Sequence, residues 1–266
     1  NRTPDSFYDR GDTYSDQAAM TAVDHAVHEG ADIVDIGGVK AGPGDDVGVA
    51  EEARRVVPFL SAVRHRHPNL VISVDTWRHQ VARPAVEAGA DIINDTWAGI
   101  DPRLAEVAAE YGCGMVCSHT GGATPRTRPH RVRYPDVVRD VVEDLTAQAV
   151  RLVGLGVPKQ AILIDPTHDF GKNTWHGLEL LRRCDELVDT GWPVLMALSN
   201  KDFIGETLDA GVDDRVAGTL AATAIAAWAQ VRVFRAHQVR QTRRVLEMVA
   251  SIAGTRPPAR AIRGLA

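Results

Sequence analysis

Short apolar runs alternate with longer amphipathic segments along most of the chain. The short runs are rich in β-branched residues and nearly continuous in hydrophobicity, which is typical of parallel strands covered on both faces. We predict seven such strands, at residues 31–36, 70–75, 91–95, 114–119, 161–165, 193–198 and 231–235. Segments of helical length and period separate them, at residues 51–67, 105–111, 134–155, 177–188 and 216–230. The pattern therefore predicts a repeating order of strand and helix.

Four of the predicted strands follow a glycine that ends the preceding helix. A left-handed residue at this position lets the chain turn tightly from helix to strand, and glycine adopts that conformation without a steric penalty. The four are Gly30, Gly89, Gly112 and Gly191. Their recurrence indicates short, repeated helix-to-strand turns.

The alternation predicts an α/β fold, namely a (β/α)8 TIM-type barrel that forms a single domain over residues 1–266. A length of 266 residues suits one barrel, and no stretch rich in Pro, Gly or Ser divides the chain. A closed barrel needs an eighth strand, and we expect the first strand to lie upstream of Asn1 or to be missing. A doubly wound open sheet is the alternative, which is weaker because no glycine-rich fingerprint follows an early strand. Residues 255–266 are expected to be a frayed terminus.

Composition and charge exclude several functional classes. Apolar residues make up 44% of the chain and charged residues 24%, close to the average for globular proteins. A net charge of −5 gives no basic field for nucleic acid or an anionic membrane, and no apolar run approaches the roughly 18 residues of a membrane helix. Three cysteines are too few and too irregularly spaced for a disulfide framework or a zinc site. We therefore expect a cytoplasmic protein that binds neither nucleic acid nor membrane.

Polar side chains recur where the predicted strands end. In a (β/α)8 barrel the carboxyl ends of the strands form the mouth that carries the chemistry. Any one of these residues is equally well explained as a strand-end hydrogen bond, but together they indicate a site. They are Asp75, Asn94 with Asp95, His119, Asp165, Lys201, and Arg235 with His237.

Arg235 and His237 are two residues apart on one predicted strand, so their side chains face the same side. Together with nearby cations they suit a phosphate or pyrophosphate group. The alternative for Arg235 is an ion pair with a neighbouring acid.

The sequence resembles the dihydropteroate synthases, and the resemblance runs from Asn1 to about His237. It opens with the Asn-Arg-Thr-Pro-Asp-Ser-Phe segment, and further matching motifs follow in the family's order. The motifs lie at residues 1–7, 35–38, 73–76, 92–95, 165–166, 170–172, 201–205 and 235–237. Each motif is weak alone, but the ordered set is specific for the family.

The resemblance implies condensation of 6-hydroxymethyl-7,8-dihydropterin diphosphate with p-aminobenzoate, releasing pyrophosphate. It implies catalytic roles for Asp75, Lys201 and Arg235, and a Mg²⁺ ion near Asn1. It also implies a homodimer, for which helix 216–230 is a candidate interface. Substrate-binding residues implied by the same motifs are Asp75, Asn94, Asp165, Phe170, Lys201, Arg235 and His237.

The loop after residue 38 departs from the family's pattern. The family continues Glu-Ser-Thr-Arg-Pro-Gly, whereas this chain has Val-Lys-Ala-Gly-Pro-Gly at residues 39–44. Ala41 and Gly42 thus replace a threonine and an arginine that contact p-aminobenzoate and diphosphate in the family. Losing one such charged contact costs about 3 kcal/mol, or roughly a hundredfold in rate.

Two further departures lie near Lys201 and after the strand that ends at Asp165. Asp202 replaces a serine near the p-aminobenzoate carboxylate, which predicts repulsion between like charges. Residues 167–169 read Thr-His-Asp in place of a glycine-rich, apolar run, which predicts weaker packing around the pterin.

Four hypotheses follow from these matches and departures. The first is a synthase paralogue with weak or absent activity that still binds a pterin or a p-aminobenzoate analogue. The second is an active synthase that uses Lys40 and Asp202 for an altered, more basic amine. The third is a pterin-dependent methyltransferase, and the fourth is a barrel scaffold that binds no pterin. The departures favour the first.

Overall fold

The computed structural model describes residues 1–3, 13–127 and 132–263. All seven predicted strands are confirmed, and every strand pair is parallel. The strands are β1 Ile33–Gly37, β2 Val71–Asp75, β3 Ile92–Asn94, β4 Gly114–Ser118, β5 Ile162–Asp165, β6 Leu195–Met196 and β7 Val233–Phe234.

The strands follow one another in chain order around the molecule. Strands β1 to β5 form one sheet in sequence order, and β6 pairs with β7. A bridge between Ile164 and Val194 joins the two groups. Within the described residues, β1 and β7 each pair with one neighbour only, which leaves the position between them for the eighth strand expected of a closed barrel.

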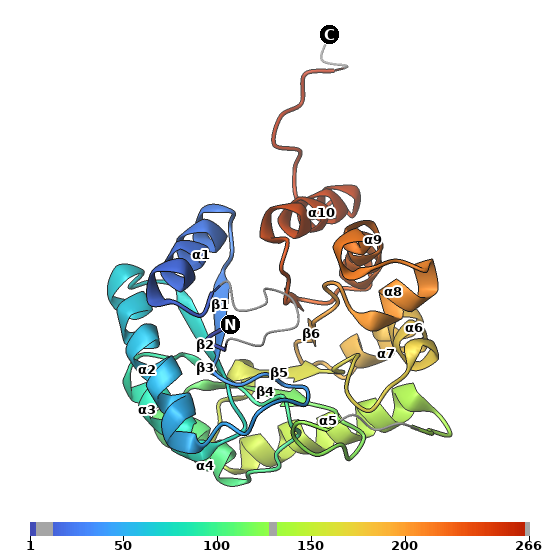
Figure 1. Cartoon of the computed structure of the whole chain (residues 1–266). Coiled ribbons are helices and arrows are strands. Elements are labelled where there is room, and N and C mark those ends of the chain that lie inside the picture. Colours follow the sequence, from blue (N-terminus) through green and yellow to red (C-terminus); the bar gives the residue numbers. More distant parts are fainter. Residues whose placement is uncertain (4–12, 128–131, 264–266) are drawn as a thin grey trace.

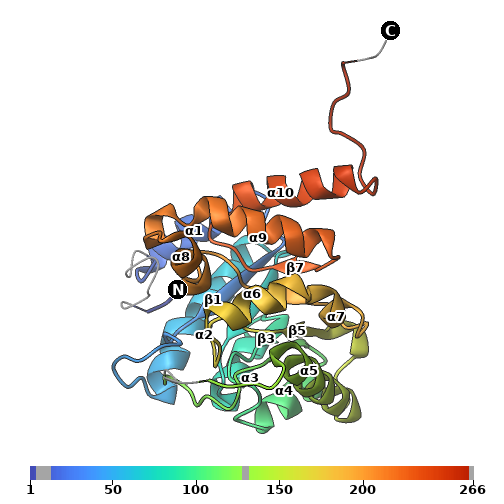
Figure 2. The ribbon, with the colours of Figure 1, turned by 90° about the vertical axis from the view of Figure 1, so that its right-hand side faces the viewer.

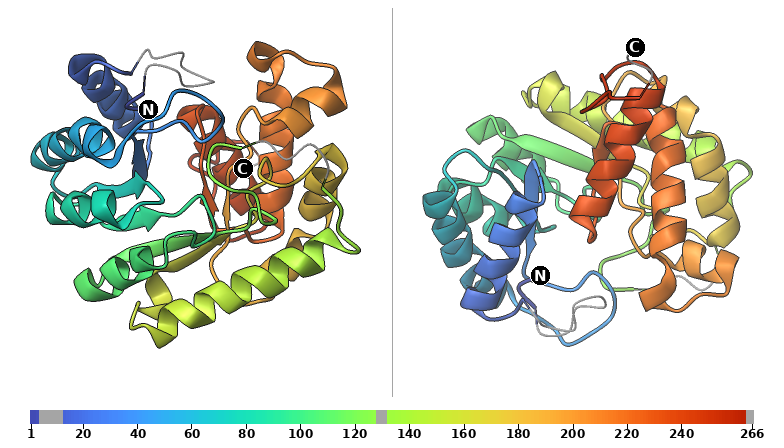
Figure 3. Two further views of the ribbon diagram at one scale, coloured as in Figure 1. Left: turned by 60° about the horizontal axis from the view of Figure 1, so that its bottom comes forward. Right: turned by 90° about the horizontal axis from the view of Figure 1, so that it is seen from above.

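Helices cover the outside of the strands, as Figures 1, 2 and 3 show. Each crossover between parallel strands needs a connection of this kind. The helices are α1 Asp16–His28, α2 Val49–Arg66, α3 His79–Glu87, α4 Arg103–Tyr111, α5 Val137–Gly154, α6 Thr174–Arg182, α7 Cys184–Val188, α8 Asp202–Leu208, α9 Val216–Trp228 and α10 Val239–Ile252. Short 3₁₀ turns lie at Lys159–Ala161 and Val212–Asp214.

The four predicted glycine turns are confirmed. All four residues have positive φ angles, of 96° at Gly30, 110° at Gly89, 63° at Gly112 and 77° at Gly191. After α10 the chain leaves the body as an extended segment (Figure 1), as predicted for the terminus.

Two predicted elements differ from the structure. The segment predicted as one helix at 177–188 forms two helices, α6 and α7, that are separated at Arg183. Arg183 has a non-helical ψ of 29°, and its guanidinium binds the carboxylates of Glu179, Glu186 and Asp136. The strand predicted at 193–198 is shorter in the structure, with Leu195 and Met196 in β6 and an isolated bridge at Val194.

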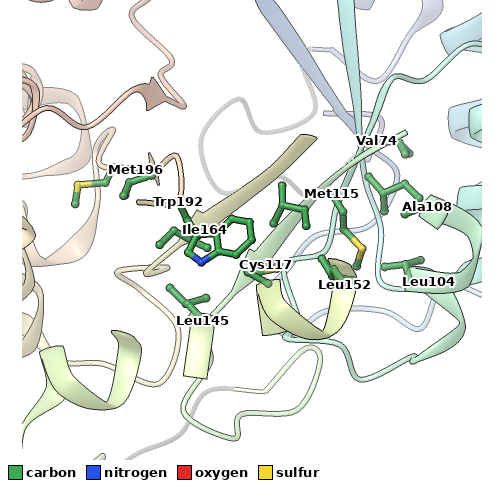
Figure 4. Packing of buried hydrophobic residues seen from close by; sticks show 14 of the residues in the cluster. Val74, Leu104, Ala108, Met115, Cys117, Leu145, Leu152, Ile164, Trp192 and Met196 are labelled. Atoms are coloured by element: carbon green, nitrogen blue, oxygen red, sulfur yellow. The ribbon is translucent and has the colours of Figure 1, made fainter. Parts of the chain in front are cut away.

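Helix α5 shows how the sequence builds the outer layer. Asp136 caps its first turn by accepting hydrogen bonds from the backbone N–H groups of Val138 and Arg139. Its buried positions recur at helical spacing and include Val141, Leu145 and Leu152. Figure 4 shows Leu145 and Leu152 beside Cys117 and Ile164 of the sheet, so one stripe of α5 completes the core over β4 and β5.

No helix among the residues that the structure describes is long and apolar enough to cross a membrane.

Leu145 provides a test of this packing because its side chain is fully buried. We expect Leu145→Ala to lower the free energy of unfolding by about 2–5 kcal/mol through lost burial and an unfilled cavity. Val150→Ala is the matched control, since Val150 lies on the same helix and is 59% exposed. Urea denaturation should show a change of no more than about 0.5 kcal/mol for the control, and equal losses in both variants would contradict the assigned packing.

Candidate functional site

The register of the parallel strands brings the predicted polar residues to one end of the sheet. Asp75 at the end of β2 is level with Gly37 on β1 and with Asn94 on β3. Asp165 at the end of β5 is level with Ser118 on β4. The strand ends therefore share one mouth, as predicted for a barrel site.

Arg235, just after β7, joins the two edges of this mouth. Its Nε lies 2.9 Å from Oδ2 of Asp35 on β1, and its Nη2 lies 3.6 Å from Oδ2 of Asp75. Asn94 Nδ2 donates to the same Asp35 oxygen at 3.1 Å. Thr96 Oγ1 donates to Oδ1 of Asp75 at 3.2 Å. The predicted residues Asp75, Asn94 and Arg235 thus form one connected cluster around Asp35.

Burial makes the carboxyl groups of Asp75 and Asp165 hard to ionise. Desolvation, reinforced by the charge of Asp35, raises the pKa of Asp75 to about 7 against the opposing effect of Arg235. Desolvation also raises the pKa of Asp165 to about 6, although the N–H of Thr167 and the charges of Lys201, Lys172 and Arg235 oppose it. Two carboxyl groups of the mouth therefore titrate near neutral pH, a property that is common at functional sites.

Lys201 lies at the start of α8, and its Nζ is 2.8 Å from Oδ2 of Asp169. In the sequence Asp169 stands out only as a polar residue in place of an apolar one, and its acidic side chain in the loop after Asp165 is the one sign of this contact. Its partner Lys201 is distant in the sequence and becomes a neighbour only in the fold.

Lys172 connects the end of β4 with the loop that follows β5. Its Nζ donates to the carbonyl oxygens of His119 at 2.8 Å, Phe170 at 3.0 Å and Thr167 at 3.2 Å. It also lies 2.9 Å from Nδ1 of His119, whose Nε2 is 2.7 Å from Asp140 on α5. Desolvation lowers the pKa of Lys172 to about 7. The His119 ring is thus engaged by two side chains of the protein.

The remaining predicted residues lie around the same mouth. Phe170 packs its ring edge-on against Trp97, with 4.8 Å between the ring centroids. The backbone N–H of His237 donates to Ser199 Oγ at 3.2 Å, which ties the end of β7 to the segment after β6. Asn1 is exposed and lines a cavity of about 130 Å³ together with Arg2 and Asp35.

Asp202 does not lie as the sequence analysis expected. Its side chain is 81% exposed, and Oδ1 is 2.9 Å from the guanidinium of Arg215. Its charge is therefore partly neutralised and hydrated, which weakens the predicted repulsion of a ligand carboxylate. Asp169 is the carboxylate that contacts Lys201.

Comparison with known proteins identifies the family. A family described as pterin binding enzymes matches residues 1–237. The chain belongs to this family. It is 64% identical to inactive dihydropteroate synthase 2 of Mycobacterium leprae over 270 residues, covering 100% of this chain and 93% of the relative.

Solved structures of pterin-binding enzymes have the same fold. The dihydropteroate synthase of Yersinia pestis in a sulfonamide complex is similar with a TM-score of 0.89 at 31% identity, covering 96% of this chain and 92% of that one. The Thermus thermophilus enzyme in complex with 4-aminobenzoate has a TM-score of 0.81 at 39% identity, and 88% of each chain is covered. The predicted TIM-type barrel is confirmed, and the doubly wound sheet is wrong.

The titration of Asp75 gives a stability prediction. Its folded pKa of about 7 lies above the usual value of 3.8, so the folded state binds more protons than the unfolded state between about pH 4 and pH 7, and stability falls as the pH rises. Asp75→Asn removes this titration. We therefore expect the free energy of unfolding of the variant, relative to the parent, to rise by on the order of 4 kcal/mol between pH 4 and pH 8.

The measurement is urea denaturation at several pH values, with Asp213→Asn as the control because Asp213 is exposed. A difference between Asp75→Asn and the parent that stays constant with pH would show that the Asp75 carboxyl is not desolvated in the folded protein.

Proposed function

We propose that this protein is a dihydropteroate synthase homologue that binds a pterin at the strand ends and has weak or no synthase activity. The observation that carries this proposal is the contrast between two parts of one mouth. Asp75, Asn94, Asp165, Lys201 and Arg235 are present, whereas the loop at 39–44 has Ala41 and Gly42 at the positions of two ligand-contacting side chains. The relatives support this reading, because the similar Mycobacterium leprae protein is named an inactive synthase.

The residues suit a pterin for chemical reasons. A pterin edge offers amine and ring N–H donors beside ring acceptors. The carboxylate of Asp165 and the amide of Asn94 can accept and donate along that edge. The ammonium of Lys201 binds Asp169, and its remaining N–H groups can donate to a ring acceptor. In the synthase reaction diphosphate leaves before the amine attacks, so the buried carboxylate of Asp75 would stabilise the pterin-methyl cation.

Diphosphate capture is the weaker half of the site. Arg235 and His237 are the residues that would hold the diphosphate, but Arg235 is already bound to Asp35 and Asp75. The loop at 39–44 supplies Lys40 as its one cationic side chain. Fewer positive charges thus face the leaving group, and its departure should be slow.

A Mg²⁺ ion near Asn1 would depend mainly on substrate phosphates, because the cavity there is lined mostly by apolar side chains of α1 and β1 and by the cationic Arg2. No cluster of metal-ligating side chains occurs among the described residues. Mg²⁺ prefers oxygen ligands and keeps few protein contacts when it also binds substrate phosphates. Asn1 and Asp35 line the same cavity. Asp35 Oδ1 is buried and makes no hydrogen bond within the described part of the chain. Asn1, with Asp35 nearby, would hold the ion, which when bound would neutralise diphosphate charge.

The relatives favour a synthase homologue over the other functions considered. The relative at 64% identity is named an inactive synthase, and a relative at 37% identity is named a dihydropteroate synthase. These names do not favour the active synthase with an altered amine or the methyltransferase. We also infer one pterin-binding domain over residues 1–266 and a cytoplasmic location. The continuous hydrophobic core supports the first, and three buried free cysteines support the second.

The experiment is pyrophosphate release with Mg²⁺, 6-hydroxymethyl-7,8-dihydropterin diphosphate and 4-aminobenzoate, with the Escherichia coli synthase run in parallel. We expect release at least roughly a hundredfold slower than that of the working enzyme, because charged contacts to the reacting groups are lost. Release at a comparable rate would overturn the proposal.

Pterin binding is measured separately by quenching of pterin fluorescence. We expect Asp165→Asn to weaken binding by about tenfold, since a hydrogen bond to a charged group is lost. Asp185→Asn is the control, because Asp185 is an exposed carboxylate on α7. Binding that is absent from the parent protein would leave only the scaffold hypothesis.

We further propose a homodimer through α9 and α10. Helices α9 and α10 pack side by side on the outside of the molecule (Figure 2). Their exposed residues include Ile225, Trp228, Met248 and Ile252, each 56–61% exposed. Large exposed apolar side chains gathered on neighbouring helices are typical of an interface, and the family's dimers supply the partner, a second copy of the chain.

Substitution of Trp228 tests this interface. We expect Trp228→Glu to raise the dimer dissociation constant by at least about tenfold in analytical ultracentrifugation. Trp175→Glu is the control, because Trp175 is 78% exposed but lies on α6. Dissociation constants that change equally in both variants would contradict the α9–α10 interface.

A further inference from the structure

The ammonium group of Lys201 is held by a carboxylate of its own chain. Lys201 follows the β6 segment and precedes α8, and its side chain is only 13% exposed. Asp169 Oδ2 lies 2.8 Å from its Nζ, and the Asp169 side chain is 28% exposed. A partly buried ion pair of this kind is less screened by salt than a surface pair.

The loop that carries Asp169 is fixed on both sides of that residue. Before it, Thr167 adopts a left-handed conformation with φ of 50°, and its N–H donates to Asp165 Oδ1 at 2.7 Å. After it, the carbonyl oxygen of Phe170 accepts a hydrogen bond from Lys172. Lys172 also binds the carbonyl oxygen of Thr167. The backbone around Asp169 is therefore held in place from within the protein.

His168 anchors the same loop to the helix that follows Lys201. Its ring is buried and stacks on Phe203 of α8, with 5.4 Å between centroids and an interplanar angle of 28°. Residues 168 and 203 thus bind the loop and α8 together beside the Lys201–Asp169 pair. The ion pair therefore joins two segments that are also held together by packing, because the neighbour of Asp169 stacks on the helix that Lys201 begins.

Two arginines, Arg235 at the mouth and Arg215 at the start of α9, are also bound by carboxylates of the chain, whereas Lys172 is bound by carbonyl oxygens and His119. Arg235 contacts Asp35 and Asp75, and Arg215 contacts Asp202. A ligand that carries a carboxylate would therefore find these positive charges already compensated. It would have to displace Asp169 in order to reach Lys201.

We propose that Asp169 is a specificity-determining residue that masks Lys201 and selects against ligands with a carboxylate at this point of the mouth. The inference rests on the proposed function, since it concerns the ligand that would lie beside the pterin. A neutral analogue such as 4-aminobenzamide escapes this selection, because it brings no second negative charge to Asp169. Asp169, and not Asp202 as predicted from the sequence, is then the residue that discriminates against a ligand carboxylate.

The first test measures whether Asp169 masks Lys201 and needs no ligand. The folded protein is acetylated briefly, and the labelling rate of each of its four lysines is measured by peptide mass spectrometry. We expect Asp169→Asn to raise the labelling rate of Lys201 by about threefold to fivefold, as for loss of an ion pair of this kind, and to leave Lys159 unchanged. Asp202→Asn is the matched control. It removes an equal charge from the residue next to Lys201, but the carboxylate of Asp202 binds Arg215 and not Lys201.

The labelling rate of Lys201 shows directly whether Asp169 masks its ammonium group. Equal labelling of Lys201 in the parent and in Asp169→Asn, or an equal rise in the Asp202→Asn control, would overturn it. Asp169→Ser is a second variant that also removes the charge, so that misfolding of one variant, detected by its thermal unfolding, does not remove the test.

The second test measures specificity by titration calorimetry with 4-aminobenzoate and 4-aminobenzamide, in the presence of pterin and pyrophosphate. We expect Asp169→Asn to tighten the binding of the benzoate by about fivefold and to change the binding of the benzamide by less than about twofold. An equal change for both ligands would overturn the charge selection. Failure of both ligands to bind either protein would overturn the selection as well, whereas pterin binding measured alone decides the proposed function.

Discussion

The ion pairs of Arg235 are the interaction on which the mouth of the barrel depends. The parallel register places Asp35 on β1 level with Ser73, two residues before Asp75 on β2. The negative charge of Asp35 therefore acts on the desolvated carboxyl of Asp75 and repels its charge. Arg235 comes from the far end of the chain and contacts both carboxylates. It therefore offsets one of the two negative charges and joins the first described strand to the last. Because Arg235 is paired with these carboxylates, its positive charge is less available to bind a diphosphate.

Much of this arrangement could be predicted from the sequence because it follows from periodicity. Continuous apolar runs identify parallel strands, and the strand ends must meet at one edge whatever the loops do. The positions of Asp75, Asn94 and Asp165 follow from that rule alone. The helix-ending glycines follow from backbone sterics in the same local way.

Contacts between loops could not be predicted in this way. The sequence placed a repulsive charge at Asp202, next to Lys201, but the first turn of α8 turns that carboxylate outward to Arg215. Asp169 is distant from Lys201 in the sequence and reaches it only because the loop after β5 lies against α8. Adjacency in the sequence was thus a poor guide, since the paths of two loops decide which carboxylate meets the lysine. The break at Arg183 likewise depends on Asp136, which lies on another segment.

The hydrogen bonds of Lys172 connect a residue on the outer surface, Asp140, with the loop after β5 at the mouth. Asp140 is 47% exposed on α5, yet it binds the buried His119 ring, which in turn contacts the lysine that holds the carbonyl groups of Thr167 and Phe170. A substitution at this surface position would reach the loop of Asp169 through two side chains. A change on the outside of the barrel therefore has a structural route, through His119 and Lys172, to the loop that contacts Lys201 inside it.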